Sequence, residues 1–295
     1  MLFRKSRPRP RQTKTPSIRS LKLSDHEFDQ LRRLVRDHAG IKLNQKKRAL
    51  VVSRLSQRLR DLDLENFSQY IDLLQNANSD DELIRMINRI TTNKTDFFRE
   101  QHHFTFLTQT VLPEVVRRTA GGGPKKLRAW SAGCSSGEEP YSLAITISQF
   151  FQDRPGWDCK ILATDLDTNM LARAAAGVYD SKRLAPVPKH LRERYFTVQR
   201  QDGLTLYQVK PEIKRMVLFR KFNLMTPEFP LRNQLDFIFC RNVMIYFGTA
   251  DRLRIVTNFH RLIHPEGYLF VGHSESLMMV PDLFKHVEST IYKRQ

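Results

Sequence analysis

The chain has 295 residues, which is enough for one large domain or two smaller ones with a well-filled core. Its formal charge of +18 predicts an acidic partner, such as nucleic acid, anionic lipid or an acidic protein. Its 3 cysteines have neither metal nor disulfide spacing, no apolar run reaches membrane-spanning length, and no apolar leader begins the chain. These features exclude a disulfide-stapled or membrane-spanning protein and predict a cytoplasmic one.

Residues 1–22 form a tail rich in proline, arginine and lysine, in which eight basic residues precede the first acidic one, Asp25. We expect this tail to be disordered, because such a composition cannot bury enough apolar surface to fold. Without the eight positive charges of the tail, the formal net charge falls from +18 to +10, so the rest of the chain is basic as well.

Periodic apolar residues predict four helices between residues 23 and 92. Two of these helices begin with capping residues, Ser24 with Glu27 and Ser79 with Glu82. This part of the chain is therefore predicted to be a small all-α domain.

The second predicted helix, from about Gln45 to Leu62, carries three basic residues on one face. These residues are Lys47, Arg54 and Arg58. On an average helix such a face is simply solvated, and the alternative is a docking surface for an acidic helix.

The pattern changes after the helical domain. The polar segment TTNKTDFFRE at 91–100 breaks the apolar period, and a further helix is expected from Phe98 to about Arg118. From Leu127 onwards short strands and helices alternate, which signals a parallel sheet. We therefore predict an α/β fold for the second part of the chain.

The segment Ala129–Ser142, AWSAGCSSGEEPYS, indicates a buried strand, a tight turn at Gly133 and the start of a helix. A loop that leaves a parallel strand at its carboxyl end is where open α/β sheets bind ligands. The acidic pair Glu138–Glu139 disfavours a phosphate and suits a ligand with positive charge or hydroxyl groups, such as S-adenosylmethionine. A plain strand-to-helix connection with an acidic first turn is the alternative.

Polar residues fall repeatedly where the predicted strands end. Asp165 ends the second strand, where a carboxylate is the usual partner of ribose hydroxyls, although its distance from the glycine loop argues against NAD. Its alternative role is to cap the next helix. A run of such residues along one edge of a sheet predicts a binding cleft. The other residues at strand ends are Asn223, Arg241, Asn242 and His273.

An insertion separates the second and third predicted strands. Asp202–Gly203 lies between two strand-like runs, which is a strong hairpin signal, and predicts a small antiparallel β-subdomain over residues 178–215. A second hairpin is expected over Leu283–Tyr292, near the end of the chain.

Four segments together resemble the CheR-type chemotaxis receptor methyltransferases, which use S-adenosylmethionine to methylate glutamate side chains on chemoreceptor helices. The segments occur in family order, and the similarity covers roughly residues 23–292. The resemblance implies an all-α domain over 23–92 and a Rossmann-like α/β methyltransferase domain over 93–295, with the β-subdomain inserted. The segments are TTNKTDFFRE, SAGCSSGEEPYS, ATDLDT and FCRNVMIYF.

The resemblance also implies roles for individual residues. Arg99 and Tyr246 would lie beside the substrate glutamate, and the basic helix with Lys47, Arg54 and Arg58 would face an acidic receptor helix. The β-subdomain can hold a receptor C-terminal peptide in this family, and the protein would be recruited to membrane-bound receptor arrays. The product of the cofactor would be S-adenosylhomocysteine. The implied cofactor contacts are Asn93, Thr95, Arg99, Glu139, Asp165, Asn223, Leu224, Arg241 and Asn242.

Two other functions are alternatives for the same residues. A nucleic-acid methyltransferase fits the basic charge, but its usual Asn/Asp-Pro-Pro-aromatic loop is replaced here by a segment that starts at Arg241. A non-catalytic module that senses the cofactor is the second alternative. His102, His103 and His273 lack companions at metal spacing, so they are predicted to be structural and no metal is expected.

Overall fold

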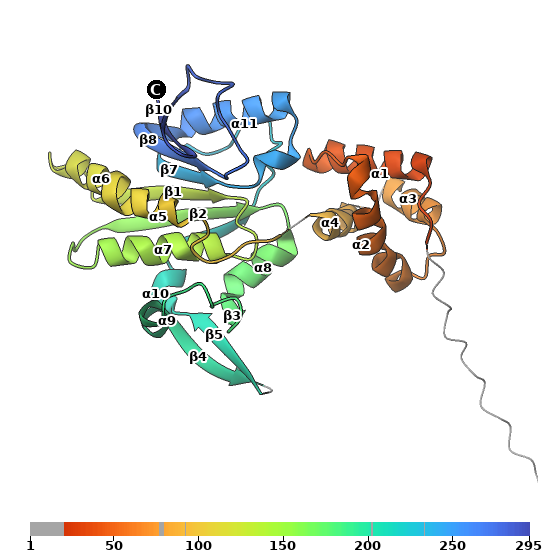
Figure 1. Ribbon diagram of the computed structural model, residues 1–295, viewed down its shortest axis with the longest axis horizontal. Helices are drawn as coiled ribbons and strands as arrows, with labels where there is room; N and C mark the ends of the chain where they lie inside the picture. The colour runs from red at the N-terminus through yellow and green to blue at the C-terminus, as the bar shows by residue number, and fades with distance from the viewer. Residues whose placement is uncertain (1–20, 77–79, 92, 202, 233) are drawn as a thin grey trace, which may run out of the picture.

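The computed structural model describes residues 21–76, 80–91, 93–201, 203–232 and 234–295 (Figure 1). The predictions for the basic tail before residue 21 and for a cap at Ser79 concern positions outside these ranges. Within the described ranges, no helix is both long enough and apolar enough to cross a membrane.

The N-terminal part is a helical domain with its own core, as predicted. Ser24 and Glu27 form the expected capping box, in which each side chain accepts a hydrogen bond from the backbone N–H of the other residue. Apolar faces meet around Phe28, Leu55 and Tyr70, which are fully buried. The elements are α1 (Asp25–Ala39), η1 (Gln45–Lys47), α2 (Arg48–Asp61), α3 (Phe67–Gln75) and α4 (Asp80–Ile90).

The helix predicted from Phe98 begins later and is not uniform. Phe98 and Glu100 have φ angles of 53° and 58°, which a right-handed helix does not accommodate, so the helix starts at the next residue. A π-helical segment interrupts it. The three parts are α5 (Gln101–Phe106), η2 (Leu107–Val111) and α6 (Leu112–Thr119).

The second domain is built on a seven-stranded sheet with the strand order β6-β2-β1-β7-β8-β10-β9. The pairs from β6 to β8 are parallel, and β10 runs antiparallel to both of its neighbours. The chain moves outward from β1 in one direction and returns to start again at β7, so the strand order reverses between β1 and β7. Such a switch point opens a crevice at the carboxyl ends of the strands. The strands are β1 (Lys126–Ala132), β2 (Asp158–Asp165), β6 (Val217–Lys221), β7 (Leu235–Cys240), β8 (Ile263–Val271), β9 (Phe284–Glu288) and β10 (Ile291–Arg294).

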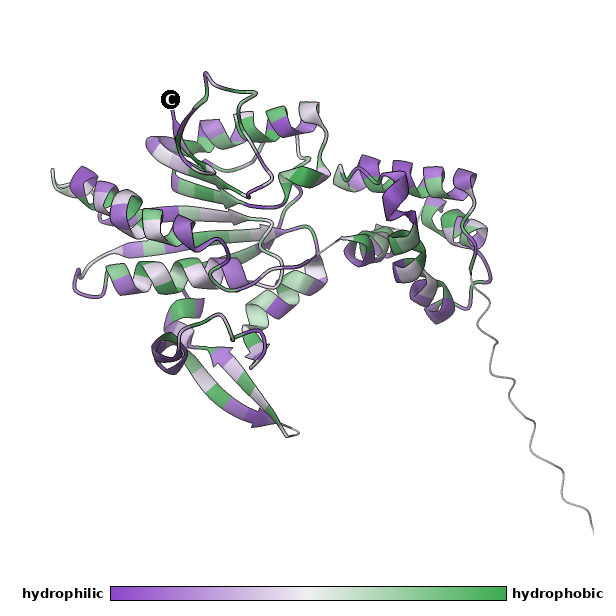
Figure 2. Cartoon of the chain, viewed as in Figure 1, coloured by the Kyte–Doolittle hydropathy of each residue, from purple (hydrophilic) through white to green (hydrophobic). Residues whose placement is uncertain are grey.

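Helices cover both faces of this sheet, and alternate residues of the central strands face each layer. Leu127 and Ala129 of β1 pack in the cluster that holds α5, α6 and α7 (Glu138–Phe150). Trp130 faces the other cluster, with α11 (Thr249–Leu262). Purple and green residues alternate along the covering helices in Figure 2, as expected for helices with one buried face.

The inserted subdomain is a separate three-stranded antiparallel sheet of order β3-β5-β4, as the hairpin signal predicted. It lies beside α8 (Thr168–Ala176) and below the main sheet in the view of Figure 1. Two contacts tie it to the glycine loop: Tyr179 Oη donates to the Ser136 carbonyl at 2.7 Å, and Arg183 pairs with Glu138 at 2.5 Å. Its elements are β3 (Val178–Asp180), α9 (Lys189–Tyr195), β4 (Phe196–Gln201), β5 (Leu204–Val209) and α10 (Pro211–Lys214).

Candidate functional site

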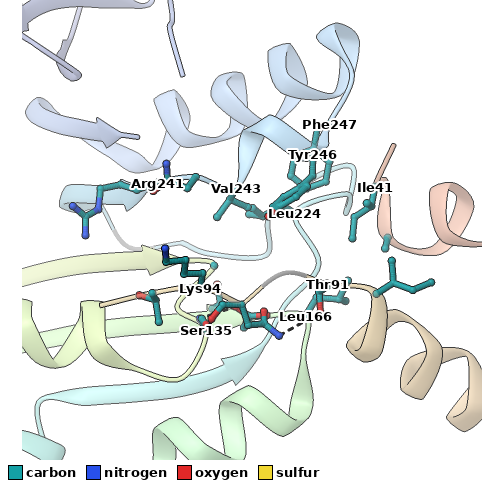
Figure 3. Close-up of a pocket in the computed structure, with 18 of the residues that line it drawn as sticks. Ile41, Thr91, Lys94, Ser135, Leu166, Leu224, Arg241, Val243, Tyr246 and Phe247 are labelled. Atoms are coloured by element: carbon teal, nitrogen blue, oxygen red, sulfur yellow. Dashed lines mark hydrogen bonds between the residues drawn. The ribbon is translucent and has the colours of Figure 1, made fainter. Parts of the chain in front are cut away.

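A cleft lies between the helical domain and the carboxyl ends of β1, β2 and β7 (Figure 3). The space within it, together with the open solvent at its entrance, amounts to about 1130 Å³. One wall comes from the sheet and the other from the helical domain, including Ile41, Lys47 and Ile90. The residues predicted from sequence that line this cleft are Lys47, Asn93, Thr95, Arg99, Glu139, Asp165, Asn223, Leu224, Arg241, Asn242 and Tyr246.

The glycine loop from β1 to α7 forms the floor of the cleft. Gly133 has a φ of 85°, and a Cβ atom at this position would lie 2.3 Å from Cγ2 of Val243. The glycine is therefore required by the side chain of the neighbouring loop as well as by its own backbone angle.

The two glutamates at the start of α7 have different roles. Glu139 accepts hydrogen bonds from Ser131 Oγ and from Arg241 Nε, both at 2.7 Å, and it lines the cleft. Glu138 instead accepts from Ser136 Oγ at 2.7 Å and pairs with Arg183 of the inserted subdomain. Only Glu139 is thus positioned to meet a ligand.

Asp165 presents a fixed carboxylate at the end of β2. Its two oxygens accept hydrogen bonds from the backbone N–H of Ser135 at 2.8 Å and of Asp167 at 2.9 Å. Burial raises the pKa of Asp165, and the backbone hydrogen bonds oppose that rise. The alternative role of helix cap belongs to Asp167, which accepts from the amides of Asn169 and Met170 at the start of α8.

Arg241 joins three segments beneath the cleft. Its side chain is 3% exposed, and besides Glu139 it donates to the backbone carbonyl of Arg99 at 2.5 Å. Its guanidinium group also lies 3.2 Å from His103 Nδ1 and 3.6 Å from Glu100. The buried cation therefore fixes both the Glu139 carboxylate and the strained segment that carries Arg99.

Three histidines lie together, and the structural role predicted for them stays a prediction. His103 is fully buried, with Nε2 2.8 Å from Thr290 Oγ1, and burial followed by the charge of Arg241 lowers its pKa to about 2. The ring of His102 is tilted against those of His103 and His273, with ring centres 4.1 and 5.2 Å away. Across the described ranges, no cluster of histidine, cysteine and acidic residues is arranged to hold a metal ion.

The helical domain reaches Tyr246 at the mouth of the cleft. The backbone N–H of Lys42 donates to the Tyr246 carbonyl at 2.9 Å, and Lys47 Nζ lies 4.8 Å above the centre of the tyrosine ring. Burial and the charge of Arg54 lower the pKa of Lys47. A further seam forms where Asn223 Nδ2 donates to the His38 carbonyl at 2.8 Å.

Arg54 and Arg58 do not line the cleft with Lys47. Arg54 donates to the last carbonyls of α4, including that of Ile90 at 2.8 Å. Arg58 forms a two-pronged ion pair with Glu82, which also accepts from Tyr70. The basic face predicted from the helical period is therefore divided, because two of its three cations hold the helical domain together.

Asn93 lines the cleft and is also hydrogen-bonded to neighbouring segments. Its Nδ2 donates to Asp167 Oδ2 at 2.8 Å, and its carbonyl accepts from Ser135 Oγ at 3.2 Å. The segment 93–99 is therefore anchored to both the glycine loop and the end of β2. Lys94 of this segment also lines the cleft, although the sequence had not singled it out.

Glu275 is a further residue that sequence reasoning missed. It lies after β8, is 6% exposed, and accepts hydrogen bonds from the backbone N–H groups of Asn242 and Ile245 in the turn after β7 and of Gly272. The available signal was the spacing of Gly272 and Glu275 directly after a predicted strand, which resembles a carboxylate that closes a turn.

Charges of both signs line the cleft. Glu139 and Asp165 offer two oriented carboxylates at the sheet, where Arg241 pairs with Glu139, whereas Lys47 comes from the helical domain and Lys94 and Arg99 come from the connecting segment 93–99. Hydroxyl and ammonium groups of a ligand fit the carboxylates, and a carboxylate fits the cations. Such a cleft can hold a positively charged donor and an acidic acceptor next to each other.

Comparisons with known proteins agree with this geometry. The family model "CheR methyltransferase, all-alpha domain" matches residues 26–91, and "CheR methyltransferase, SAM binding domain" matches residues 93–293. A chemotaxis protein methyltransferase from Borreliella burgdorferi is 37% identical, covering 93% of this chain and 96% of that protein. One from Escherichia coli is 38% identical and covers 92% of both chains. The chain therefore belongs to the CheR methyltransferase family.

Proposed function

We propose that this protein is an S-adenosylmethionine-dependent protein-glutamate O-methyltransferase that acts on the cytoplasmic helices of chemoreceptors. The observation that carries the proposal is the single cleft lined by two oriented carboxylates, Glu139 and Asp165, by the cations of Lys47, Lys94 and Arg99, and by Tyr246. The relatives are chemotaxis protein methyltransferases, which supports a chemoreceptor as the substrate. The family match supports S-adenosylmethionine as the cofactor.

The residues on the sheet side suit this cofactor. Each oxygen of Asp165 and Glu139 already accepts one hydrogen bond and retains a free lone pair, so each carboxylate can accept from a ribose hydroxyl or an ammonium group. Asp165 would hold the ribose and Glu139 the amino group. Asn93, Thr95, Asn223, Leu224 and Asn242 would complete the binding site, where the cofactor supplies an electrophilic methyl group.

The substrate side needs no proton acceptor. A glutamate side chain is ionised at pH 7, so its oxygen is already nucleophilic, and the enzyme must mainly align it and remove water. Alignment of this kind lowers a barrier by about 7–11 kcal/mol. Arg99 would hold one carboxylate oxygen, and Tyr246 would hydrogen-bond near the line of transfer. Lys47, above the Tyr246 ring, would draw an acidic helix to the cleft.

Arg54 and Arg58 have a minor role in this proposal. Their guanidinium groups bind within the helical domain, so any contribution to receptor docking is through the positive potential of α2. The inserted β-subdomain would hold a receptor C-terminal peptide, which is supported by β4, a strand that pairs only with β5 in its sheet. Docking of this kind would recruit the protein to membrane-bound receptor arrays.

The test is incubation of the full chain with tritiated S-adenosylmethionine and membranes that contain chemoreceptors, followed by alkaline release of methanol. We expect base-labile label on the receptor, and none when its methylatable glutamates are changed to alanine. Cofactor binding by calorimetry without any labelled receptor would favour a non-catalytic module. Label on duplex DNA or RNA, weakened by salt, would instead favour a nucleic-acid methyltransferase.

A further inference from the structure

Glu275 is a buried carboxylate that lies outside the lining of the cleft and outside the four motifs. It lies in the connection between β8 and β9 and is 6% exposed. Among the described residues no lysine, arginine or histidine lies within ion-pair distance of it. A buried charge without a cation must be held by hydrogen bonds, so its neighbours indicate its purpose.

All of the hydrogen bonds to its side chain come from main-chain N–H groups. Oε2 accepts from Asn242 at 2.7 Å and from Gly272 at 2.6 Å, and Oε1 accepts from Ile245 at 3.2 Å. Burial raises the pKa of Glu275, and these backbone N–H groups oppose the rise. One carboxylate thus joins the end of β8 to both ends of the turn that follows β7.

The turn that Glu275 holds has an unfavourable backbone conformation. Asn242 has a φ of 60°, in the left-handed region, and it is the first residue after Arg241 in the cleft wall. A Cβ atom on Gly272 would lie 2.5 Å from Asn242 Nδ2, so the glycine leaves room for this arrangement. The 3₁₀ turn η3 (Met244–Tyr246) follows directly and carries Tyr246 to the cleft mouth.

We propose that Glu275 is a positioning residue, which holds the Asn242–Tyr246 turn so that Tyr246 faces the cleft. It acts through the backbone of the turn and touches neither cofactor nor substrate. The inference depends on the proposed function only in the measurement of kcat for methyl transfer. Glutamine at this position is nearly isosteric but has one acceptor oxygen, so at least one of the backbone N–H groups would face an NH₂ group.

The experiment compares Glu275→Gln with Asp236→Asn in the full chain. Asp236 lies near the start of β7, the strand that leads into the Asn242–Tyr246 turn. It is 7% exposed and accepts hydrogen bonds from the backbone N–H of Arg128 at 2.7 Å and from Arg118. It is therefore a buried carboxylate with a backbone donor, far along the strand from the cleft. Both variants are measured for thermal stability, amide hydrogen exchange, binding of S-adenosylhomocysteine and kcat for receptor methylation.

We expect Glu275→Gln to speed hydrogen exchange at residues 241–247 by about 10-fold or more and to lower kcat by about 10-fold, as the loss of a hydrogen bond to a charged group predicts. Asp236→Asn should leave exchange in that segment and kcat within about 2-fold, even if its stability falls equally. Unchanged exchange at 241–247 in folded Glu275→Gln would overturn the proposal, as would equal loss of kcat in both variants. Because hydrogen exchange is measured without substrate, this test of Glu275 remains valid even if the receptor is not methylated.

Discussion

The two sides of the cleft use charge in different ways. On the sheet side, Glu139, Asp165 and Arg241 are largely buried, and each is tied by hydrogen bonds before any ligand binds. On the helical side, Lys47 rests on an aromatic ring, and among the described residues no carboxylate lies within ion-pair distance of its ammonium group. The difference suggests that the first side is preorganised for one small ligand, whereas the second tolerates a range of acidic surfaces.

The largest effect is expected at the buried cation of the sheet side. Arg241→Met would leave Glu139 buried without its partner, so the free energy of unfolding should fall by about 3–5 kcal/mol, and methylation should be lost. Denaturant unfolding and the tritium assay measure both quantities. Wild-type stability in this variant would contradict the idea of a tied, preorganised wall.

Substitution of Arg99 would test the side that faces the substrate. Arg99→Ala should lower kcat by about 10–100-fold, because a charge-assisted contact to the substrate carboxylate is lost, while the fold survives. Tyr246→Phe should lower kcat less, by about 10-fold. If both variants turn over at the wild-type rate under saturating cofactor, the assignment of these two residues is wrong.

Asp165 tests the cofactor half of the comparison on its own. Asp165→Asn keeps the size of the side chain but removes its charge, and we expect affinity for S-adenosylhomocysteine to fall by about 10-fold. Calorimetry of the purified variant measures this directly. Asp236→Asn removes the charge of a buried carboxylate that does not line the cleft and should affect thermal stability more than affinity, so it serves as the matched control.

The smallest effects are expected for the basic residues of η1 and α2, and they distinguish the role of Lys47 from that of Arg58. Lys47→Ala should raise KM for the receptor by about 3–10-fold, with a dependence on salt, and leave kcat nearly unchanged. Arg58→Ala should instead lower the unfolding free energy by about 1–3 kcal/mol, because the largely buried Glu82 loses its ion-pair partner. Equal rises of KM in both variants would show that α2 docks the receptor as one surface.

Much of the fold could be predicted from local patterns. The strand Leu235–Cys240, the pairing of β4 with β5 and the Ser24–Glu27 box all depend on neighbours in sequence, although Asp202 of the predicted turn lies outside the described residues. Asp165, Arg241 and Asn242 line one cleft because parallel strands place their carboxyl ends together, whereas His273 after β8 does not line it. The pairing of Arg58 with Glu82 and the turn held by Glu275 were not predictable in this way, since each joins segments whose packing the local pattern does not fix.

The bond from the Lys42 amide to the Tyr246 carbonyl consists of main-chain atoms alone. Nearly any residue can stand at either position without removing it, so this seam between the domains can persist while the surface of the protein diverges. Proline at position 42 is the exception, because it lacks the N–H group. Relatives that dock on different receptors can thus exchange their outer side chains and still keep the tyrosine in register with the helical domain.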